Sequence, residues 1–146
     1  MTTGQAVAAL VPHAGSMCLI DAVASWDQAS VSCRSASHRR AEHPLRRDGT
    51  LSSIHLLEYA AQATAVHGGL VAGDGGRRVP PKYLAAARDF EVHVAALDDV
   101  HADLQIDAER LLTMGDSILY RFHVSADGQL LASGRLTIVP VPGEAS

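Results

Sequence analysis

One segment of the chain, residues 52–71, has the composition of a long helix, and no other segment competes with it. It combines leucine with many alanines, and Ser52 or Ser53 stands where an N-cap is expected. The glycines at 68–69 or Gly73 mark its end. Such a helix buries little surface by itself, but its small side chains let another layer approach closely. We therefore expect a central helix covered by a sheet.

Alternation of apolar and polar residues indicates the strands of that sheet. The pattern occurs at residues 31–33 before the helix, and at residues 90–94, 104–108, 118–124 and 130–139 after it. Asp127 and Gly128 are typical of a two-residue hairpin turn. Consecutive strands joined by short turns form an antiparallel sheet. The expected fold class is α+β, with residues 1–146 forming a single domain in which an antiparallel β-sheet wraps a long central helix.

Composition argues against several classes of function. The chain has 12 Lys and Arg against 16 Asp and Glu, a net charge of −4, which is the wrong sign for a nucleic-acid or anionic-membrane partner. No apolar stretch reaches the length of a membrane span, and the N-terminus lacks the pattern of a signal peptide. Cys18 and Cys33 are too few and too far apart for a disulfide scaffold or a CxxC site. We expect a cytoplasmic protein.

Glu58 is the acidic group of the helix, with His55 three residues before it and Gln62 four residues after it, so the three share one face. This face is either the solvated side of an amphipathic helix or a buried site. If the sheet covers it, burial disfavours the charged carboxylate, and Glu58 becomes an acid that donates a proton near neutral pH, with Gln62 holding it in place. His55 and Glu58 alone do not complete a metal-ligand set, so no metal is expected.

An acid of this kind needs a complementary base, and histidines in irregular chain are the candidates: His13, His38 and His43. His13 follows a proline and precedes Ala-Gly, a sequence that can aim the ring inward. His43 belongs to an arginine-rich loop that we expect to be solvated and mobile. A base must be held within hydrogen-bond reach of the proton it removes, which favours His13 over His43.

Seven of the 12 basic residues lie in two loops, at 38–51 and 73–81, or directly beside the second of them. They either dock an anionic partner, such as a phosphorylated cofactor arm or an acidic carrier protein, or are merely solvated. The second loop lacks the Gly-Lys-Ser/Thr ending of a phosphate loop, so it is not a nucleotide site. The candidates for docking are Arg39, Arg40, Arg46, Arg47, Arg77 and Arg78.

Several motifs resemble those of known enzymes. Residues 10–13 (Leu-Val-Pro-His), followed by residues 17–23, resemble the N-terminal signature of 3-hydroxyacyl acyl-carrier-protein dehydratases, and residues 57–62 resemble their Glu-x-x-Ala-Gln helix signature. The chain is more closely similar to the predicted dehydratases of aryl polyene pigment clusters. That likeness includes His38, residues 44–46, Gly49, residues 58–63, 66–68 and 83–85, Arg88, Asp89, Gly134 and Arg135.

This resemblance implies the hotdog fold, a homodimer or a heterodimer with another hotdog subunit, and an active site between protomers. It also implies syn elimination of water from a (3R)-3-hydroxyacyl thioester on the phosphopantetheine arm of an acyl carrier protein, with no cofactor of the enzyme's own. Glu58 would protonate the departing hydroxyl and a histidine would remove the C2 proton. Backbone N–H groups at the helix start, at Ser53 and Ile54, would polarise the thioester carbonyl, and His55 and Gln62 would contact substrate or acid.

One departure concerns the base. The fatty-acid enzymes carry their catalytic histidine in a Gly-His-Phe-Pro loop fourteen residues before the glutamate, and here that count reaches Pro44, beside His43. Pigment-cluster relatives often have Asn-Pro-Leu-Arg in this loop, which favours His13 and leaves His43 as the alternative. Two other functions stay open: a hotdog thioesterase in which Glu58 activates water, and a non-catalytic acyl-binding or assembly subunit.

Overall fold

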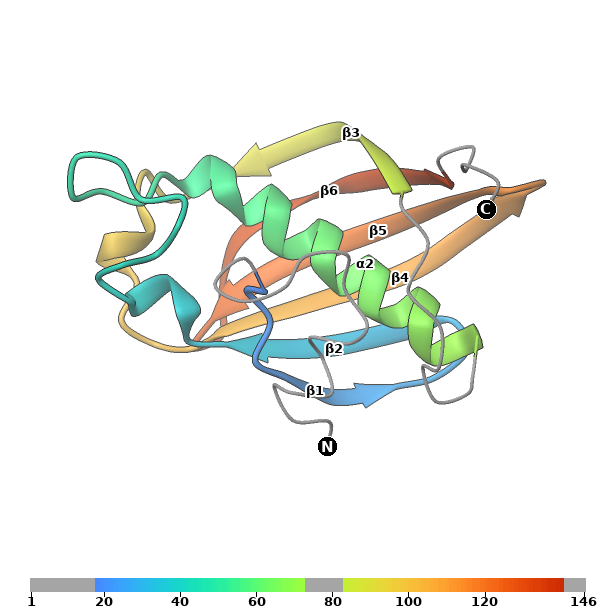
Figure 1. Cartoon of the computed structure of the whole chain (residues 1–146), viewed down its shortest axis with the longest axis horizontal. Helices are drawn as coiled ribbons and strands as arrows, with labels where there is room; N and C mark the ends of the chain where they lie inside the picture. Colours follow the sequence, from blue (N-terminus) through green and yellow to red (C-terminus); the bar gives the residue numbers. More distant parts are fainter. Residues whose placement is uncertain (1–17, 73–82, 141–146) are drawn as a thin grey trace.

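The computed structural model describes residues 18–72 and 83–140, in which one long helix lies across a face of a sheet (Figure 1). Helix α2 spans Leu56–Ala72 and is preceded by a 3-10 turn, η3, at Ser53–His55. Ser52 caps the turn, its side-chain oxygen accepting from the N–H of Ile54. The expected helix is thus confirmed, and it continues through both glycines at 68–69. No helix in the described ranges is long and apolar enough to cross a membrane.

The sheet has six strands in the order β1-β2-β4-β5-β6-β3, with every neighbouring pair antiparallel. The strands are β1 (Ala22–Trp26), β2 (Ser30–Ser35), β3 (Tyr83–Val92), β4 (Leu104–Met114), β5 (Ser117–Ala126) and β6 (Gln129–Pro140). Two further 3-10 turns, η2 (Ser37–Arg39) and η4 (Leu97–Asp99), lie near the start of α2. Asp127 and Gly128 both have positive φ, at 51° and 79°, and form the expected tight turn between β5 and β6.

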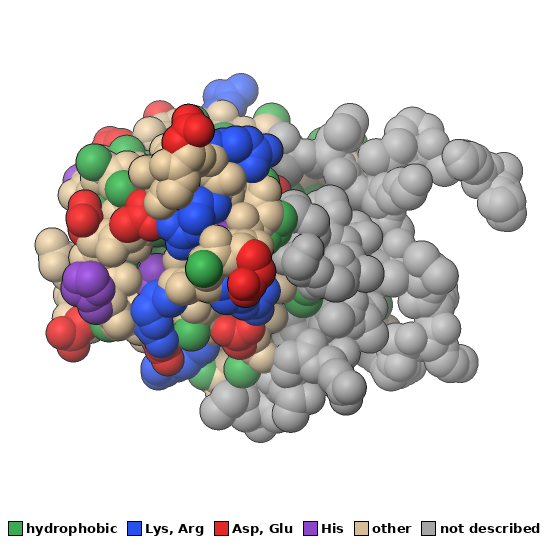
Figure 2. Space-filling view, turned by 60° about the vertical axis from the view of Figure 1, so that its left-hand side comes forward, with side chains coloured by type: hydrophobic (Ala, Val, Ile, Leu, Met, Phe, Trp, Pro, Cys, Tyr) green, Lys and Arg blue, Asp and Glu red, His purple; other side chains and the backbone are tan. Residues whose placement is uncertain are grey.

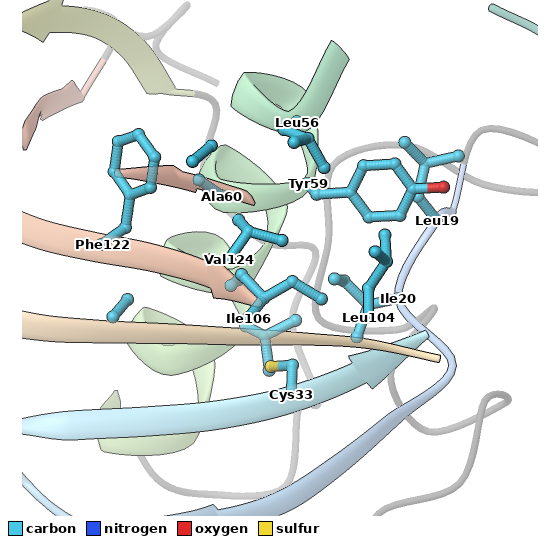
Figure 3. Packing of buried hydrophobic residues seen from close by; sticks show 14 of the residues in the cluster. Leu19, Ile20, Cys33, Leu56, Tyr59, Ala60, Leu104, Ile106, Phe122 and Val124 are labelled. Carbon is cyan, nitrogen blue, oxygen red and sulfur yellow. The ribbon is translucent and has the colours of Figure 1, made fainter. Parts of the chain in front are cut away.

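The core lies between α2 and the sheet face that it covers (Figure 3). Alternate residues of β5, namely Tyr120, Phe122 and Val124, are buried against the helix, while Arg121 and His123 between them are exposed. Each large apolar side chain that leaves water in this way contributes about 1.5–3 kcal/mol. Alternation therefore identified β4, β5 and β6 correctly, and the α+β class with a central helix is confirmed.

Two strands differ from the expectation. The strand expected at 90–94 instead begins at Tyr83 and ends at Val92, and strand β1 was not expected at all. Both are the outermost strands of the sheet. An edge strand is partly exposed on both faces, so its sequence is not forced to alternate between apolar and polar residues.

A bulge interrupts β3 near its end. Asp89, with a φ of 55°, and Phe90 together stand opposite the single residue Gly134 of β6. Arg135, beside this glycine, forms an ion pair with Asp89. A Cβ atom on Gly134 would lie 3.2 Å from Phe90 Cα and 3.0 Å from Phe122 Cζ, so the close approach of these chains requires glycine.

Candidate active site

A pocket of about 300 Å³ opens at the start of α2, beside β3. Its lining consists of Ile54, His55, Leu57, Glu58 and Ala61 from the helical segment, Ala87 from β3 and Leu136 from β6. Three residues expected in the site, Glu58, His55 and Ile54, therefore meet here. Glu58 is half-buried, and Ile54 is 58% exposed. The pocket thus places Glu58 and His55 on a wall that is otherwise apolar, and it is open to solvent in the single chain.

Gln62 orients the carboxyl of Glu58 from the buried side of the helix. Its Nε2 donates to Glu58 Oε2 at 2.9 Å, and its Oε1 accepts from the N–H of Leu19 at 2.8 Å. Amide nitrogen can only donate, so Oε2 is held as an acceptor. A proton carried by Glu58 therefore resides on Oε1. The sequence pattern anticipated this pairing, because residues four apart face each other on a helix.

The backbone donors at the helix start all have partners within the chain. Ser53 is buried, and its N–H donates to the carbonyl of Ala95 at 3.2 Å. The N–H of Ile54 donates to Ser52 Oγ at 3.3 Å, and that of His55 donates to Ser52 O at 3.2 Å. The first of these three is sealed inside the protein. Only the donors of Ile54 and His55 belong to residues that line the pocket.

His43 is buried, contrary to the expectation of a solvated and mobile loop, with 3% of its surface exposed. Its Nδ1 accepts from the N–H of Leu45 at 3.1 Å, so Nε2 carries the proton and donates to Tyr59 Oη, also at 3.1 Å. Burial, followed by the nearby charges of Arg46 and Arg40, lowers the pKa of His43 to about 4. The ring is neutral at working pH, with both nitrogens engaged.

The other candidate bases occupy different places. His13 lies outside the described residues. His38 is buried and donates from Nε2 to the carbonyl of Val100 at 3.0 Å, and burial lowers its pKa. It lines a separate hollow of about 480 Å³ that contains neither Glu58 nor His55. Within residues 18–72 and 83–140, no group of three His, Cys, Asp or Glu side chains is arranged to hold a metal ion.

The arginines of the first loop are largely neutralised within the chain. Three of them pair with aspartates: Arg39 with Asp103 at 2.8 Å, Arg40 with Asp21 at 3.5 Å, and Arg46 with Asp98. Arg47 donates to the backbone carbonyls of Pro44 and Arg46 and has no acidic partner among the described residues. Figure 2 shows acidic side chains interspersed with the basic ones at this end of the molecule. Arg77 and Arg78 lie outside the described residues.

Comparison with known proteins identifies this chain's family. The family model described as ApeP-like, ApeP dehydratase, matches residues 5–145. The chain belongs to the ApeP-like dehydratase family. The resemblance to aryl polyene dehydratases seen in the sequence is thereby confirmed. No curated protein matches the chain.

Solved structures share the hotdog fold with this family member. The dehydratase heterocomplex ApeI:P from Xenorhabdus doucetiae matches with a TM-score of 0.77 and 23% identity, covering 92% of this chain and 90% of that chain. AziG from S. sahachiroi matches with a TM-score of 0.56 and 13% identity, covering 82% and 90%. A hypothetical thioesterase with coenzyme A from Streptococcus pneumoniae matches with a TM-score of 0.55 and 11% identity, covering 85% and 87%. At these identities the matches establish the fold.

The buried state of His43 predicts a specific loss of stability in acid. In the unfolded chain the imidazole binds a proton near pH 6.5, whereas in the folded chain it does so only near pH 4. Between these values the unfolded state binds more protons, so the free energy of unfolding falls as the pH falls, by up to about 3 kcal/mol. Urea denaturation between pH 7.5 and 5 should show a weaker pH dependence for His43→Gln than for the wild type.

The matched control is His101→Gln, because His101 is exposed. This variant should keep the wild-type dependence. If His43→Gln also kept it, the ring would not be held neutral in the folded state.

Proposed function

We propose that this chain eliminates water from a (3R)-3-hydroxyacyl thioester carried on the phosphopantetheine arm of an acyl carrier protein. Membership of the ApeP-like family establishes the dehydratase class, and the substrate is the proposed part. The observation that carries the proposal is the carboxyl of Glu58, turned by Gln62 at the rim of an apolar pocket. An acid in such surroundings suits protonation of a hydroxyl leaving group.

The reaction needs one base and one acid. The base removes a proton from C2, the released electron pair forms the C2–C3 double bond, and the C3 hydroxyl departs. Glu58 gives its proton from Oε1 to that hydroxyl, which leaves as water, while Oε2 stays fixed by Gln62. Proton transfer from the base back to Glu58 through solvent restores the enzyme. The same groups acting in reverse hydrate a 2-enoyl thioester.

We assign the base to His13 rather than His43. Both nitrogens of His43 already have partners, and a pKa of about 4 makes the ring a weak base near neutral pH. His13 stands six residues before Leu19, whose N–H bonds to the same Gln62 that holds Glu58. The first described residues after His13 are thus bonded to the residue that orients the acid.

The thioester would lie at the start of α2. The bond from Ile54 N–H to Ser52 Oγ is long, at 3.3 Å, so rotation of the Ser52 side chain would release this donor for a thioester carbonyl at small cost. The positive end of the helix dipole also stabilises negative charge that develops there. Leu57 and Leu136 offer apolar surface to the acyl chain, and His55 completes the wall beside Glu58.

Glu58→Gln should lower turnover at least about a hundredfold while leaving the fold intact, since the amide cannot supply the proton. His13→Ala should lower it by a similar factor, and His43→Gln should cost much less. Turnover is followed with 3-hydroxyacyl and 2-enoyl thioesters, recording enoyl absorbance and free thiol together. Far-ultraviolet circular dichroism checks the fold.

Glu109→Gln is the control, because Glu109 is exposed on β4 away from the pocket. Full turnover by Glu58→Gln would remove the acid from the mechanism. Release of thiol without enoyl chemistry would make the protein a thioesterase. No reaction of either kind in the wild type, alone or with a partner subunit, would indicate a binding or assembly role.

We further propose that the free edge of β3 pairs with another hotdog subunit and completes the site. The pocket lies beside this edge, and Ile54 at its rim is exposed in the single chain. The similar ApeI:P structure is a heterocomplex, which supports a second, different subunit as the partner. Pairing would satisfy the open backbone groups of β3 and close the pocket from one side.

Proline substitutions at neighbouring positions of β3 test this pairing. Successive N–H groups of a strand point to opposite sides, so of Ala85→Pro and Ala86→Pro one breaks a bond to β6 and the other removes a donor from the free edge. We expect the variant that loses a bond to β6 to unfold. The variant that loses the free-edge donor should stay folded but lose subunit association, measured by native mass spectrometry with and without the partner. If the variant that lacks the free-edge donor stayed folded and still associated fully, pairing through β3 would be contradicted.

Docking of an acidic carrier is the remaining part of the proposal. Arg39, Arg40 and Arg46 are paired with aspartates within the chain. Substitution of Arg47, Arg77 and Arg78 is therefore the better test of whether the two loops attract an acidic carrier. Reversing these three charges should raise KM for a carrier-bound substrate about tenfold at low salt, and the loss should shrink as salt is added. A small free thioester should be unaffected. Reversal of Arg121, exposed on β5, is the control, and equal effects on both substrates would exclude docking here.

A further inference from the structure

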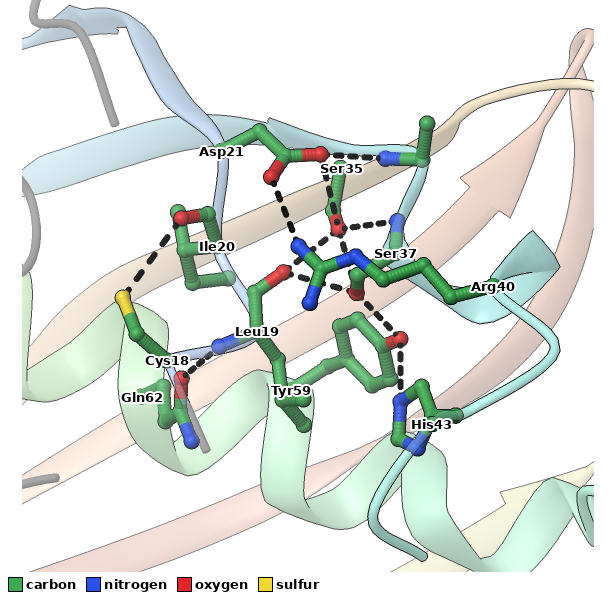
Figure 4. Close-up of polar contacts among 11 residues, drawn as sticks. Cys18, Leu19, Ile20, Asp21, Ser35, Ser37, Arg40, His43, Tyr59 and Gln62 are labelled. Atoms are coloured by element: carbon green, nitrogen blue, oxygen red, sulfur yellow. Dashed lines mark hydrogen bonds and ion pairs between the residues drawn. The ribbon is translucent and has the colours of Figure 1, made fainter. Parts of the chain in front are cut away.

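A chain of hydrogen bonds with a fixed direction runs from His43 through Tyr59 and Ser37 to the backbone of Leu19 (Figure 4). Leu45 N–H occupies Nδ1 of His43, so the proton on Nε2 is donated to Tyr59 Oη. Tyr59 must then use its own proton for Ser37 Oγ, 2.6 Å away. Ser37 Oγ in turn donates to the carbonyl of Leu19 at 2.9 Å, so each hydroxyl in the chain donates toward Leu19.

Leu19 is held from two sides. Its carbonyl accepts from Ser37 and also from Ser35 Oγ at 2.5 Å. Its N–H donates to Gln62 Oε1 at 2.8 Å, and the other end of the same amide donates to Glu58. The buried backbone of Leu19 is therefore the connection between the histidine and the carboxyl of the pocket.

We propose that His43 and Tyr59 are positioning residues for the acid of this enzyme: through Ser37 and Leu19 they fix Gln62, and thereby set the orientation of the Glu58 carboxyl. The consequence for catalysis rests on the proposed function of Glu58. The geometric link does not, because it depends only on contacts within this chain. We call the residues His43, Tyr59, Ser37 and Ser35 the Leu19 clamp.

The clamp keeps one protonation state over the working range of pH. Burial raises the pKa of Tyr59 to about 12, and the pKa of His43 is about 4. Arg46, Arg40, His55 and His38 are the basic groups that act on the histidine. Arg40 and Asp21, which pair with each other, act on the tyrosine. Between about pH 5 and 10 both rings are neutral, so the donors and acceptors do not exchange roles.

His43 acts at a distance from the substrate. Neither His43 nor Tyr59 lines the pocket that holds Glu58. The loop that supplies the base in the fatty-acid enzymes therefore contributes support here rather than a reacting group. Misplacement of a catalytic group by a fraction of an ångström lowers turnover without changing substrate binding, and that is the signature expected on loss of the clamp.

Three variants separate a positioning role from a catalytic one. Tyr59→Phe and His43→Leu each break the clamp and should lower kcat about tenfold with KM unchanged within about twofold. Combining them should cost no more than either one, because both break the same chain. His43→Gln keeps an N–H donor near Tyr59 and should therefore retain most of the activity. If His43 were the base, glutamine could not replace it, because an amide does not accept the substrate's proton.

A second buried histidine and tyrosine pair provides the matched control. His67 Nδ1 lies 2.7 Å from Tyr120 Oη within the core, and neither residue lines the pocket or belongs to the Leu19 clamp. Tyr120→Phe should therefore reduce stability and leave kcat unchanged. If His43→Gln were as inactive as His43→Leu, His43 would be the base, and the positioning role would be wrong.

A readout independent of activity tests the clamp itself. Hydrogen exchange at the Leu19 amide, measured by NMR on the full chain, should speed up at least about tenfold in Tyr59→Phe and stay at the wild-type rate in Tyr120→Phe. Unchanged exchange in Tyr59→Phe would overturn the clamp whatever the enzyme does. An inactive wild type with faster Leu19 exchange in Tyr59→Phe would instead overturn the proposed function and leave the clamp standing.

Discussion

Burial of one face of α2 against the sheet is the constraint on which the other features depend. Leu56, Tyr59, Ala60 and Ala63 are fully buried, and the small residues among them let the strands come close to the helix backbone. At 3.6 residues per turn, Glu58 falls at the rim of this buried face. Its carboxyl is therefore neither fully buried nor fully hydrated, and Gln62 on the buried side can orient it by a hydrogen bond.

Close packing makes every polar group beneath the helix expensive unless it is paired. The two fully engaged histidines illustrate the solution: His43 and His67 each meet a tyrosine hydroxyl, one pair near the start of α2 and one further along it. Such pairs add little net stability but permit only one arrangement of the surrounding chain. In this protein they fix where loops and strand ends meet the helix.

The sequence allowed accurate prediction where a single periodicity decides the structure. The helix and strands β4 to β6 follow from such patterns, and so does the contact of Glu58 with Gln62, four residues apart. Edge strand β1 and most of edge strand β3 could not be predicted, because exposure removes the alternating pattern. The burial of His43 depends on meeting Tyr59, and the pairing of Arg46 depends on Asp98, a partner far along the chain. Such contacts exist only once the fold has formed.

The bulge at Asp89 and Phe90 has a consequence for how sheets recognise one another. A long, straight outer strand accepts almost any extended peptide, which is why exposed edges lead to aggregation. Here the pairing register of the outer strand shifts after Arg88. The ion pair of Asp89 with Arg135 and the lack of a side chain at Gly134 stabilise this shift. An unbroken ladder can extend only over the part of β3 before that point. The bulge therefore limits the length and register of any strand that joins this edge, and favours a matching subunit over an arbitrary chain.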